Sequence, residues 1–360
     1  MSEAAGPALA TRLTKLVGCR YPIVQTGMGY VAGAGLASAV CQAGGLGIIA
    51  ASTMTVAEMT AAITAAKDRA AGAPFGVNIR ADAADAAERA DVMIAEGVRV
   101  ASFALAPTRE LIAKLKDAGL VVIPSVGARR HAEKVAAWGA DAVIVQGGEG
   151  GGHTGPVPTT LLLPDVVRAV DIPVIAAGGF FDGRGLVAAL AYGACGIAMG
   201  TRFLLTSDSP VPDAVKHEYL SRGLRDTVVT TRVDGVPHRV LRTPLVEGLE
   251  RAGRSGALLR SVANAARLRR ISGLSWPAMI REGRTMRRGR ELTWAQVLMA
   301  ANTPMLLRAA MVDGRADLGV MASGQVAGLI EDLPSCAELI GRIMAEACEV
   351  LGSLAALLTP

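Results

Sequence analysis

Aromatic side chains are scarce in this sequence, at 3% of 360 residues, and cysteine is limited to five widely spaced positions. There is no CxxC pair, which argues against a disulfide scaffold, a zinc ribbon and dithiol redox chemistry. A GxSxG motif is also missing, so we expect no serine-hydrolase triad. Unpaired thiols suit a reducing compartment, and residues 1–20 contain no long apolar core. We therefore expect a cytoplasmic protein without a signal peptide.

Charged side chains are absent from residues 21–57, a pattern that can indicate a membrane span. This stretch, however, contains seven glycines and Pro22, which suit a buried strand, a glycine-rich loop and a buried helix. We therefore expect no association with a membrane.

Positive charge is concentrated in residues 251–290, which hold eleven arginines and one acid, Glu282. The net charge of the chain is +5 and that of this segment is +10, so the remainder carries about −5. Such a patch can attract nucleic acid, anionic lipid or a phosphorylated ligand. Nucleic-acid binders usually add stacking aromatics, and Trp276 is the only aromatic residue here. We expect no nucleic acid partner, and we favour a ligand with several phosphates over a merely solvated helix face.

Eight short apolar runs recur through the first 200 residues, separated by stretches of helical composition. This alternation predicts βαβ units with parallel strands, and near-continuous apolar runs are typical of strands buried on both faces. Eight such units favour an α/β fold of the (β/α)8 TIM barrel type over an open sheet. The predicted strands are Pro22–Gln25, Leu46–Ala50, Phe75–Ile79, Val98–Phe103, Val121–Val126, Ala142–Gln146, Val174–Ala177 and Ile197–Met199.

The pattern changes at Ser207, where the turn-rich sequence SDSPVP begins. We expect residues 210–320, which include the arginine-rich segment, to form a mainly helical lobe after the eighth strand. Residues 1–209 and 321–360 then form the barrel, with 329–358 returning as one or two helices. The helices predicted within the barrel cover 57–71, 108–118, 130–138 and 184–191.

The last two predicted strands end in glycine, with Gly178 and Gly179 after one and Gly200 and Thr201 after the other. Loops at these positions of a TIM barrel commonly bind phosphate through backbone N–H groups. The alternative is that these glycines only form tight turns. We favour a phosphate site, and the phosphate of a flavin mononucleotide (FMN) would suit it.

His153 lies in the sequence QGGEGGGHTG at 146–155, where six of ten residues are glycine. A helix cannot persist in such a segment, so we expect a loop at the mouth of the barrel. Histidine is the side chain best matched to proton transfer near neutral pH. We predict that His153 is catalytic rather than structural. We expect no metal site, because only Glu149 lies at ligand spacing from it along the chain.

Five blocks of the sequence together resemble the nitronate monooxygenase (2-nitropropane dioxygenase-like) flavoproteins, and flavin-dependent enoyl-acyl-carrier-protein reductases share the pattern. The likeness covers about residues 10–205 and resumes near 320. The blocks are PIVQTGMGYVAGAGLASAVCQAGGLGIIAAS at 22–52, GVN at 76–78, QGGEGGGHTG at 146–155, PVIAAGGFFDGRGLVAALAYGACGIAMGTRFL at 173–204 and SGQVAGLI at 323–330.

This resemblance implies a TIM barrel that binds FMN without a covalent link. In the family pattern, His153 matches a histidine that acts as a base or positions the substrate. The residues implied to hold the cofactor are Gln25, Thr26, Gly27 and Met28 along the flavin ring, Asn78 and Gln146 at its polar edge, Gly151 and Gly152 beside it, Gly178, Gly179, Gly200 and Thr201 at the phosphate, and Gln325 in a closing segment.

The sequence also departs from the family pattern. Thr154 follows the histidine where many nitronate enzymes have arginine, and Arg80 stands where the family more often has an apolar residue. The arginine-rich segment is larger than a small nitronate requires. The sequence is most similar to a branch assigned to steroid-ring breakdown, in which an FMN enzyme desaturates a coenzyme A (CoA) thioester.

We therefore expect an FMN-dependent oxidoreductase that removes an α-proton from a ring-bearing acyl-CoA while hydride passes to flavin. Arg80, Arg269 and Arg270 are the predicted substrate-binding residues, the last two for the phosphates of CoA. The alternatives are a nitronate monooxygenase, an NAD(P)H-dependent enoyl-thioester reductase and a flavin-free binding protein. The sequence leaves the oligomeric state open, a homodimer included.

Overall fold

The structure, a computed structural model, describes residues 9–251 and 303–358. Eight parallel strands form a closed barrel in the order β1-β2-β3-β4-β5-β6-β8-β9. The barrel closes where β1 pairs with β9, with Ile23 opposite Ile197. The predicted TIM barrel is confirmed. The barrel strands are β1 (Ile23–Gln25), β2 (Leu46–Ala50), β3 (Gly76–Ile79), β4 (Val100–Phe103), β5 (Val121–Val126), β6 (Val143–Gln146), β8 (Val174–Ala177) and β9 (Ile197–Met199).

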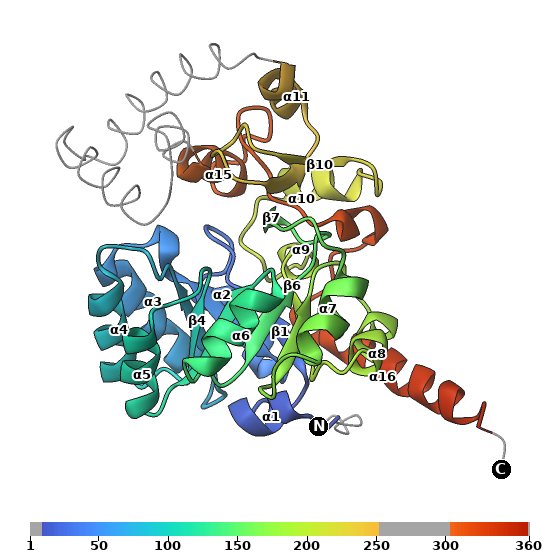
Figure 1. The fold of residues 1–360 in the computed structure, drawn as a ribbon. Coiled ribbons are helices and arrows are strands. Elements are labelled where there is room, and N and C mark those ends of the chain that lie inside the picture. The colour runs from blue at the N-terminus through green and yellow to red at the C-terminus, as the bar shows by residue number, and fades with distance from the viewer. Residues whose placement is uncertain (1–8, 252–302, 359–360) are drawn as a thin grey trace.

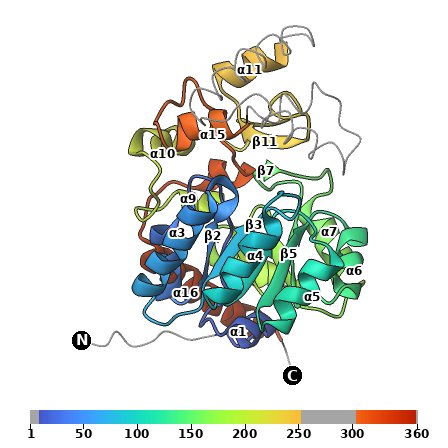
Figure 2. The same ribbon diagram turned by 90° about the vertical axis from the view of Figure 1, so that its left-hand side faces the viewer.

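Helices follow the strands and cover the outside of the barrel (Figures 1 and 2). Several begin at polar caps; the Thr55 hydroxyl, for example, accepts a hydrogen bond from the Glu58 N–H at 3.2 Å. The four helices that we predicted are present as α3, α5, α6 and α8. The helices of this part of the chain are α1 (Arg12–Val17), α2 (Ala34–Gln42), α3 (Val56–Arg69), α4 (Ala86–Ala95), α5 (Arg109–Asp117), α6 (Arg129–Ala137), α7 (Thr159–Val167), α8 (Gly183–Ala191) and α9 (Thr201–Leu204), with a 3-10 turn at Ala51–Thr53.

The interior of the barrel is filled by the inward side chains of its strands, and α1 closes one end. Leu13 and Val17 of α1 belong to the same buried cluster as Val24, Ile48 and Ile144. Figures 1 and 2 show α1 at the end of the barrel opposite to the lobe. The uncharged stretch 21–57 forms β1, α2, β2 and the turn after β2. No helix in the described part of the chain is long and apolar enough to cross a membrane.

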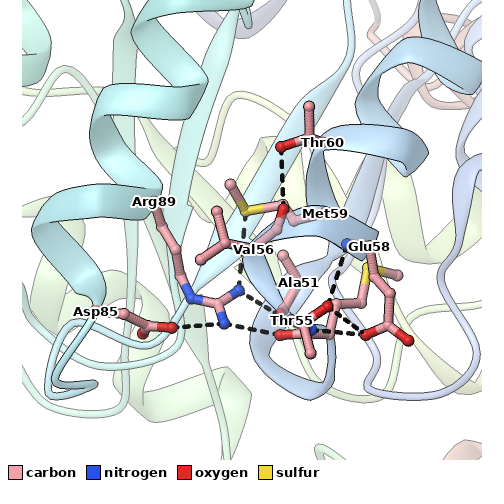
Figure 3. A network of polar contacts seen from close by, with 9 residues as sticks. Ala51, Thr55, Val56, Glu58, Met59, Thr60, Asp85 and Arg89 are labelled. Carbon is pink, nitrogen blue, oxygen red and sulfur yellow. Dashed lines mark hydrogen bonds and ion pairs between the residues drawn. The ribbon is translucent and has the colours of Figure 1, made fainter.

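A buried arginine fixes the loop after β2. Arg89 of α4 is 7% exposed and donates hydrogen bonds to the carbonyls of Ala51 at 2.9 Å and Met54 at 2.7 Å. Asp85 balances its charge through an ion pair at 2.8 Å (Figure 3). Because a buried guanidinium is stable only when its N–H groups are paired, this network holds the loop in one conformation.

The lobe lies at the end of the barrel opposite to α1 (Figures 1 and 2). Its described elements are α10 (Asp213–Leu220), β10 (Thr227–Thr230), β11 (His238–Leu241), α11 (Pro244–Arg251) and α15 (Thr303–Met311). The antiparallel strands β10 and β11 were not among our predictions. They form a three-stranded sheet with β7 (Gly152–His153), which comes from the glycine-rich loop of the barrel.

The chain returns to the barrel through a 3-10 turn at Gln325–Leu329 and the helix α16 (Cys336–Ala355). Helix α16 begins at a capping box of Ser335 and Glu338 and packs against α8 and α2. Glu346 of α16 accepts a hydrogen bond from the Gly183 N–H at 2.8 Å, at the start of α8. The division into a barrel of 1–209 with 321–360 and a lobe of 210–320 remains a prediction.

Candidate active site

A cavity of about 330 Å³ lies between the carboxyl ends of the barrel strands and the lobe. The loops after β1, β4, β6, β8 and β9 contribute to its walls, as do Asn78 of β3, the strand β11, α15 and the segment after residue 321. Most of the predicted cofactor residues line it: Thr26, Gly27, Met28, Asn78, Gln146, Gly151, Gly152, Gly178, Gly179, Gly200 and Thr201.

Two of these glycines are required by close packing. A Cβ atom on Gly27 would lie 2.6 Å from the Cβ of Asn78. A Cβ atom on Gly151 would lie 2.5 Å from the backbone nitrogen of Gly324. Any larger residue would therefore push the loop into the cavity or away from its neighbour.

The loop after β8 has a backbone that favours glycine. Gly178 has a φ of +99° and Gly179 a φ of +85°, both in the left-handed region. These residues border the cavity together with Gly200 and Thr201 at the end of β9. Without side chains the backbone reaches the cavity surface, which is the arrangement that phosphate binding at this edge of a barrel requires.

Two predicted cofactor residues do not line the cavity. Gln25 is fully buried, and its side-chain amide donates to the carbonyl of Ile48 at 3.2 Å, on the neighbouring strand β2. Gln325 donates its backbone N–H to the carbonyl of Glu149 at 3.0 Å. The neighbouring Gly324 donates to the Thr201 hydroxyl at 2.9 Å. The segment around Gln325 therefore closes on the cavity through its backbone, and any role of the two glutamine side chains toward a cofactor remains a prediction.

The glycine-rich loop after β6 is held at several points. The carboxylate of Glu149 accepts hydrogen bonds from the Thr159 N–H at 2.9 Å and the Thr159 hydroxyl at 2.7 Å, at the start of α7. Gln146 donates to the carbonyl of His153 at 2.9 Å, and Arg239 donates to that of Gly148 at 2.8 Å. The loop is therefore fixed despite its glycine content.

This loop places His153 beside two residues of the lobe. His153 in β7 is the cross-strand partner of His238 in β11, and the ring centroids are 4.7 Å apart. Asp234 lies in the turn between β10 and β11. Its Oδ2 atom is 2.6 Å from Nε2 of His153 and 3.3 Å from Nδ1 of His238. Asp234 and His238 are buried, whereas the His153 side chain is 61% exposed.

The protonation of Asp234 determines what the histidines can do. Burial alone would raise the pKa of Asp234, but hydrogen bonds from His153 and His238 outweigh this effect and hold the pKa well below its usual range. An ionised carboxylate only accepts hydrogen bonds, so His153 must donate through Nε2. Its Nδ1 atom then carries the lone pair, which makes Nδ1 the basic atom.

The side chains of His153, Asp234 and His238 are close enough to be considered as metal ligands, since their ligand atoms lie within 4.8 Å of one another. Two ligand atoms on a tetrahedral zinc ion would be about 3.3 Å apart, given metal–ligand distances of about 2.0–2.1 Å. The 2.6 Å contact between His153 and Asp234 is shorter than that and is typical of a charge-assisted hydrogen bond. We interpret the group as hydrogen-bonded.

Sequence analysis did not identify Asp234 or His238. A signal was present, because Asp234-Gly235 lies between the runs TVVT and HRVL, and Asp-Gly between apolar runs indicates a β-hairpin. The hairpin alone would not have revealed that it pairs with the loop of His153, 81 residues earlier.

Of the predicted substrate-binding arginines, only Arg80 lies among the described residues. Arg80 follows β3 and forms an ion pair with Asp82 at 3.0 Å, and it is not among the described residues that line the cavity. Arg269 and Arg270 lie outside the described residues. Their assignment remains a prediction.

Part of the cavity lining is apolar. Leu307 and Met311 of α15 line the cavity, as do Val31, Leu204 and Val326. An apolar surface of this kind suits a hydrocarbon ring better than a small polar anion.

The comparisons with known proteins agree with this geometry. The family model "Nitronate monooxygenase" matches residues 10–346. A Mycobacterium tuberculosis protein, "(3aS,4S,5R,7aS)-5-hydroxy-7a-methyl-1-oxo-octahydro-1H-indene-4-carboxyl-CoA dehydrogenase", is 66% identical over 97% of this chain and 99% of its own length.

Two solved structures extend the likeness to the fold. FabK from Thermotoga maritima has 35% identity and a TM-score of 0.78, with 97% of this chain and 100% of that chain covered. A nitroalkane oxidase from Streptomyces ansochromogenes has 30% identity and a TM-score of 0.73, with 95% and 99% covered. Nitronate monooxygenases and FabK-like proteins are flavin enzymes. The chain belongs to the nitronate monooxygenase family and is an oxidoreductase.

Proposed function

We propose that this protein is a dehydrogenase that desaturates the CoA thioester of a ring-bearing, steroid-derived acid. The observation that carries the proposal is the cavity itself, whose lining combines His153, hydrogen-bonded to Asp234, with glycines at the barrel strand ends and apolar side chains of α15. The name of the Mycobacterium relative, which describes a bicyclic carboxyl-CoA, supports the substrate class.

We further propose FMN as the cofactor. Gly27 packs closely against Asn78 in the cavity wall, and the left-handed Gly178 and Gly179 also border the cavity without side chains. These features fit a planar ring and a phosphate. The bound flavin would supply the hydride acceptor for the reaction.

The chain's own residues supply the proton chemistry. Nδ1 of His153 takes the proton from the carbon beside the thioester carbonyl, and the resulting imidazolium is stabilised by the carboxylate of Asp234 at 2.6 Å. A backbone N–H of the glycine-rich loop is the proposed donor to the thioester oxygen, where negative charge develops. The apolar side chains of α15 exclude water from the ring of the substrate.

We propose that arginine side chains bind the CoA portion of the substrate. The segment 251–290 carries +10, and we propose that Arg269 and Arg270 pair with the phosphates of CoA. Free cysteines at all five positions suit a reducing compartment, so we also propose that the protein is cytoplasmic.

Nitronate oxidation is the second candidate. The family model and the Streptomyces nitroalkane oxidase favour it, and removal of an α-proton by a histidine would serve it equally well. The apolar surface of α15 and the basic segment would then have no substrate to contact.

Product analysis tests the proposal. The yellow protein is incubated with the CoA thioester of a bicyclic acid and an artificial electron acceptor, and the product is examined by mass spectrometry and NMR. We expect an α,β-unsaturated thioester two hydrogen atoms lighter than the substrate. His153→Asn should abolish formation of the unsaturated thioester. His217→Asn, which replaces an exposed histidine of α10, should leave its formation unchanged. A thioester recovered unchanged with the wild-type enzyme would contradict the proposal.

A further inference from the structure

Two polar atoms in the wall of the cavity are buried without a hydrogen-bond partner among the described residues. They are Nε2 of His238 and Oγ1 of Thr303, and both residues line the cavity. His238 is only 2% exposed. Buried polar atoms in proteins are nearly always paired, and an unpaired one is costly. Two such atoms at one cavity therefore point to a polar group of a ligand.

Asp234 defines the hydrogen-bonding character of the His238 ring. Nδ1 of His238 lies 3.3 Å from the carboxylate of Asp234, so Nδ1 carries the hydrogen. In the neutral ring, Nε2 then accepts a hydrogen bond. The hydroxyl of Thr303 can donate one. An acceptor and a donor together complement an alcohol, which both donates and accepts.

The location of His238 relates this pair to the reacting carbon. Its ring lies 4.7 Å from that of His153, the base in the proposed reaction. The name of the Mycobacterium relative places a hydroxyl on carbon 5, next to carbon 4, which bears the carboxyl-CoA group. The α-proton is on carbon 4. Two imidazoles at this separation suit groups on adjacent carbons.

We propose that His238 and Thr303 bind a ring hydroxyl on the carbon next to the thioester-bearing carbon, and so select hydroxylated substrates. This inference rests on the proposed dehydrogenase function. His238 accepts the hydrogen of the hydroxyl through Nε2, and Thr303 donates to its oxygen. The hydroxyl itself is not oxidised. It orients the ring so that the α-proton faces Nδ1 of His153.

The test compares two bicyclic CoA thioesters that differ only in this hydroxyl. Stopped-flow reduction of the flavin under anaerobic conditions gives the rate and the apparent Kd for each. We expect the wild-type enzyme to favour the hydroxylated thioester at least tenfold in rate divided by Kd, because an analogue without the hydroxyl leaves both protein atoms unpaired.

Three variants and a control separate the roles. His238→Asn keeps an N–H near the position of Nδ1 but removes Nε2, so the preference should fall to within twofold. His238→Gln retains a polar atom near the position of Nε2 and should keep part of the preference for the hydroxylated thioester. Thr303→Val, which preserves the shape of the side chain, should reduce this preference. The control is Ser38→Ala in α2, whose buried hydroxyl also lacks a partner among the described residues but does not line the cavity. Its preference should equal that of the wild type.

The outcomes distinguish this inference from the function on which it rests. If His238→Asn and Thr303→Val slow both thioesters equally while desaturation continues, the hydroxyl-binding role is wrong and the dehydrogenase function stands. Equal flavin reduction by both thioesters in the wild-type enzyme would likewise show that the hydroxyl-binding role is wrong, while the dehydrogenase function stands. If the product carries a ketone in place of the hydroxyl, the proposed desaturation itself is wrong.

Discussion

At the scale of single residues, the proposed proton transfer depends on one carboxylate, that of Asp234. Asp234 is buried and its Oδ2 atom contacts both His153 and His238. Its depressed pKa keeps it ionised, so it fixes the tautomer of each ring. In the proposed reaction, the carboxylate also stabilises the charge that His153 gains when it takes a proton. We therefore propose that Asp234 is a positioning residue that acts through His153.

The Asp234→Asn variant tests this role. An amide can donate as well as accept, so it permits the wrong tautomer of His153, and we expect kcat to fall by about 100-fold or more with little change in KM. Steady-state kinetics with the CoA thioester measures both constants. Asp317→Asn, in an exposed ion pair with Arg315, is the matched control and should leave them unchanged. A wild-type kcat in Asp234→Asn would contradict the role.

His153 could be predicted from the sequence, whereas its partners could not. A histidine in a loop of six glycines at the end of a barrel strand is unusual in composition alone. Asp234 and His238 become recognisable only once the hairpin of β10 and β11 pairs with β7, and β7 has two residues. Such a short strand has no periodicity that a sequence can reveal.

At the scale of elements, the glycine-rich loop connects the barrel to the lobe. In this loop, Glu149 accepts a hydrogen bond from the start of α7, and β7 pairs with β11 of the lobe. Gly151 packs against the backbone of Gly324. This last contact leaves no room for a side chain. The loop therefore holds both His153, the proposed base, and the segment that closes the cavity.

Gly151→Ala should disturb the cavity, because the new Cβ would lie 2.5 Å from Gly324 nitrogen. We expect the protein to retain less flavin after gel filtration and its free energy of unfolding to fall by about 1–3 kcal/mol. Gly341→Ala is the control. Gly341 lies in α16 with open space around its Cβ position, so alanine should raise the free energy of unfolding by about 0.5–1 kcal/mol. Urea titrations and flavin absorbance measure the two effects, and equal behaviour of both variants would contradict the packing argument.

The barrel strands were predicted within two residues because both faces are buried, which gives continuous apolar runs. Strands β10 and β11 were not predicted, because we expected a mainly helical lobe over residues 210–320. In β10 the burial pattern is mixed, with Thr227 and Thr230 buried and the exposed Val229 between them. Polar residues inside and an apolar residue outside hide a strand from pattern analysis.

At the scale of the whole molecule, charge is divided between two parts of the chain. The segment 251–290 carries +10 while the remainder carries about −5. A CoA thioester is anionic, so a localised positive segment would raise its rate of association and lower its KM. The effect should weaken as salt screens the charges.

Charge reversal tests this role of the basic segment. We expect Arg269→Glu combined with Arg270→Glu to raise KM for the CoA thioester about tenfold and to leave kcat nearly unchanged. The wild-type KM should rise with salt more steeply than that of the variant. The control combines Arg184→Glu with Arg315→Glu, two exposed arginines outside the segment. Equal KM values for both double variants would show that the segment does not bind CoA.

Anaerobic mixing tests the central claim most directly. The protein, loaded with FMN, is mixed with a bicyclic CoA thioester or with an alkyl nitronate, and the visible absorbance of the flavin is followed. A dehydrogenase of CoA thioesters predicts that the thioester bleaches the flavin and that the nitronate does not. Bleaching by the nitronate alone would contradict the account and assign this protein to nitronate oxidation.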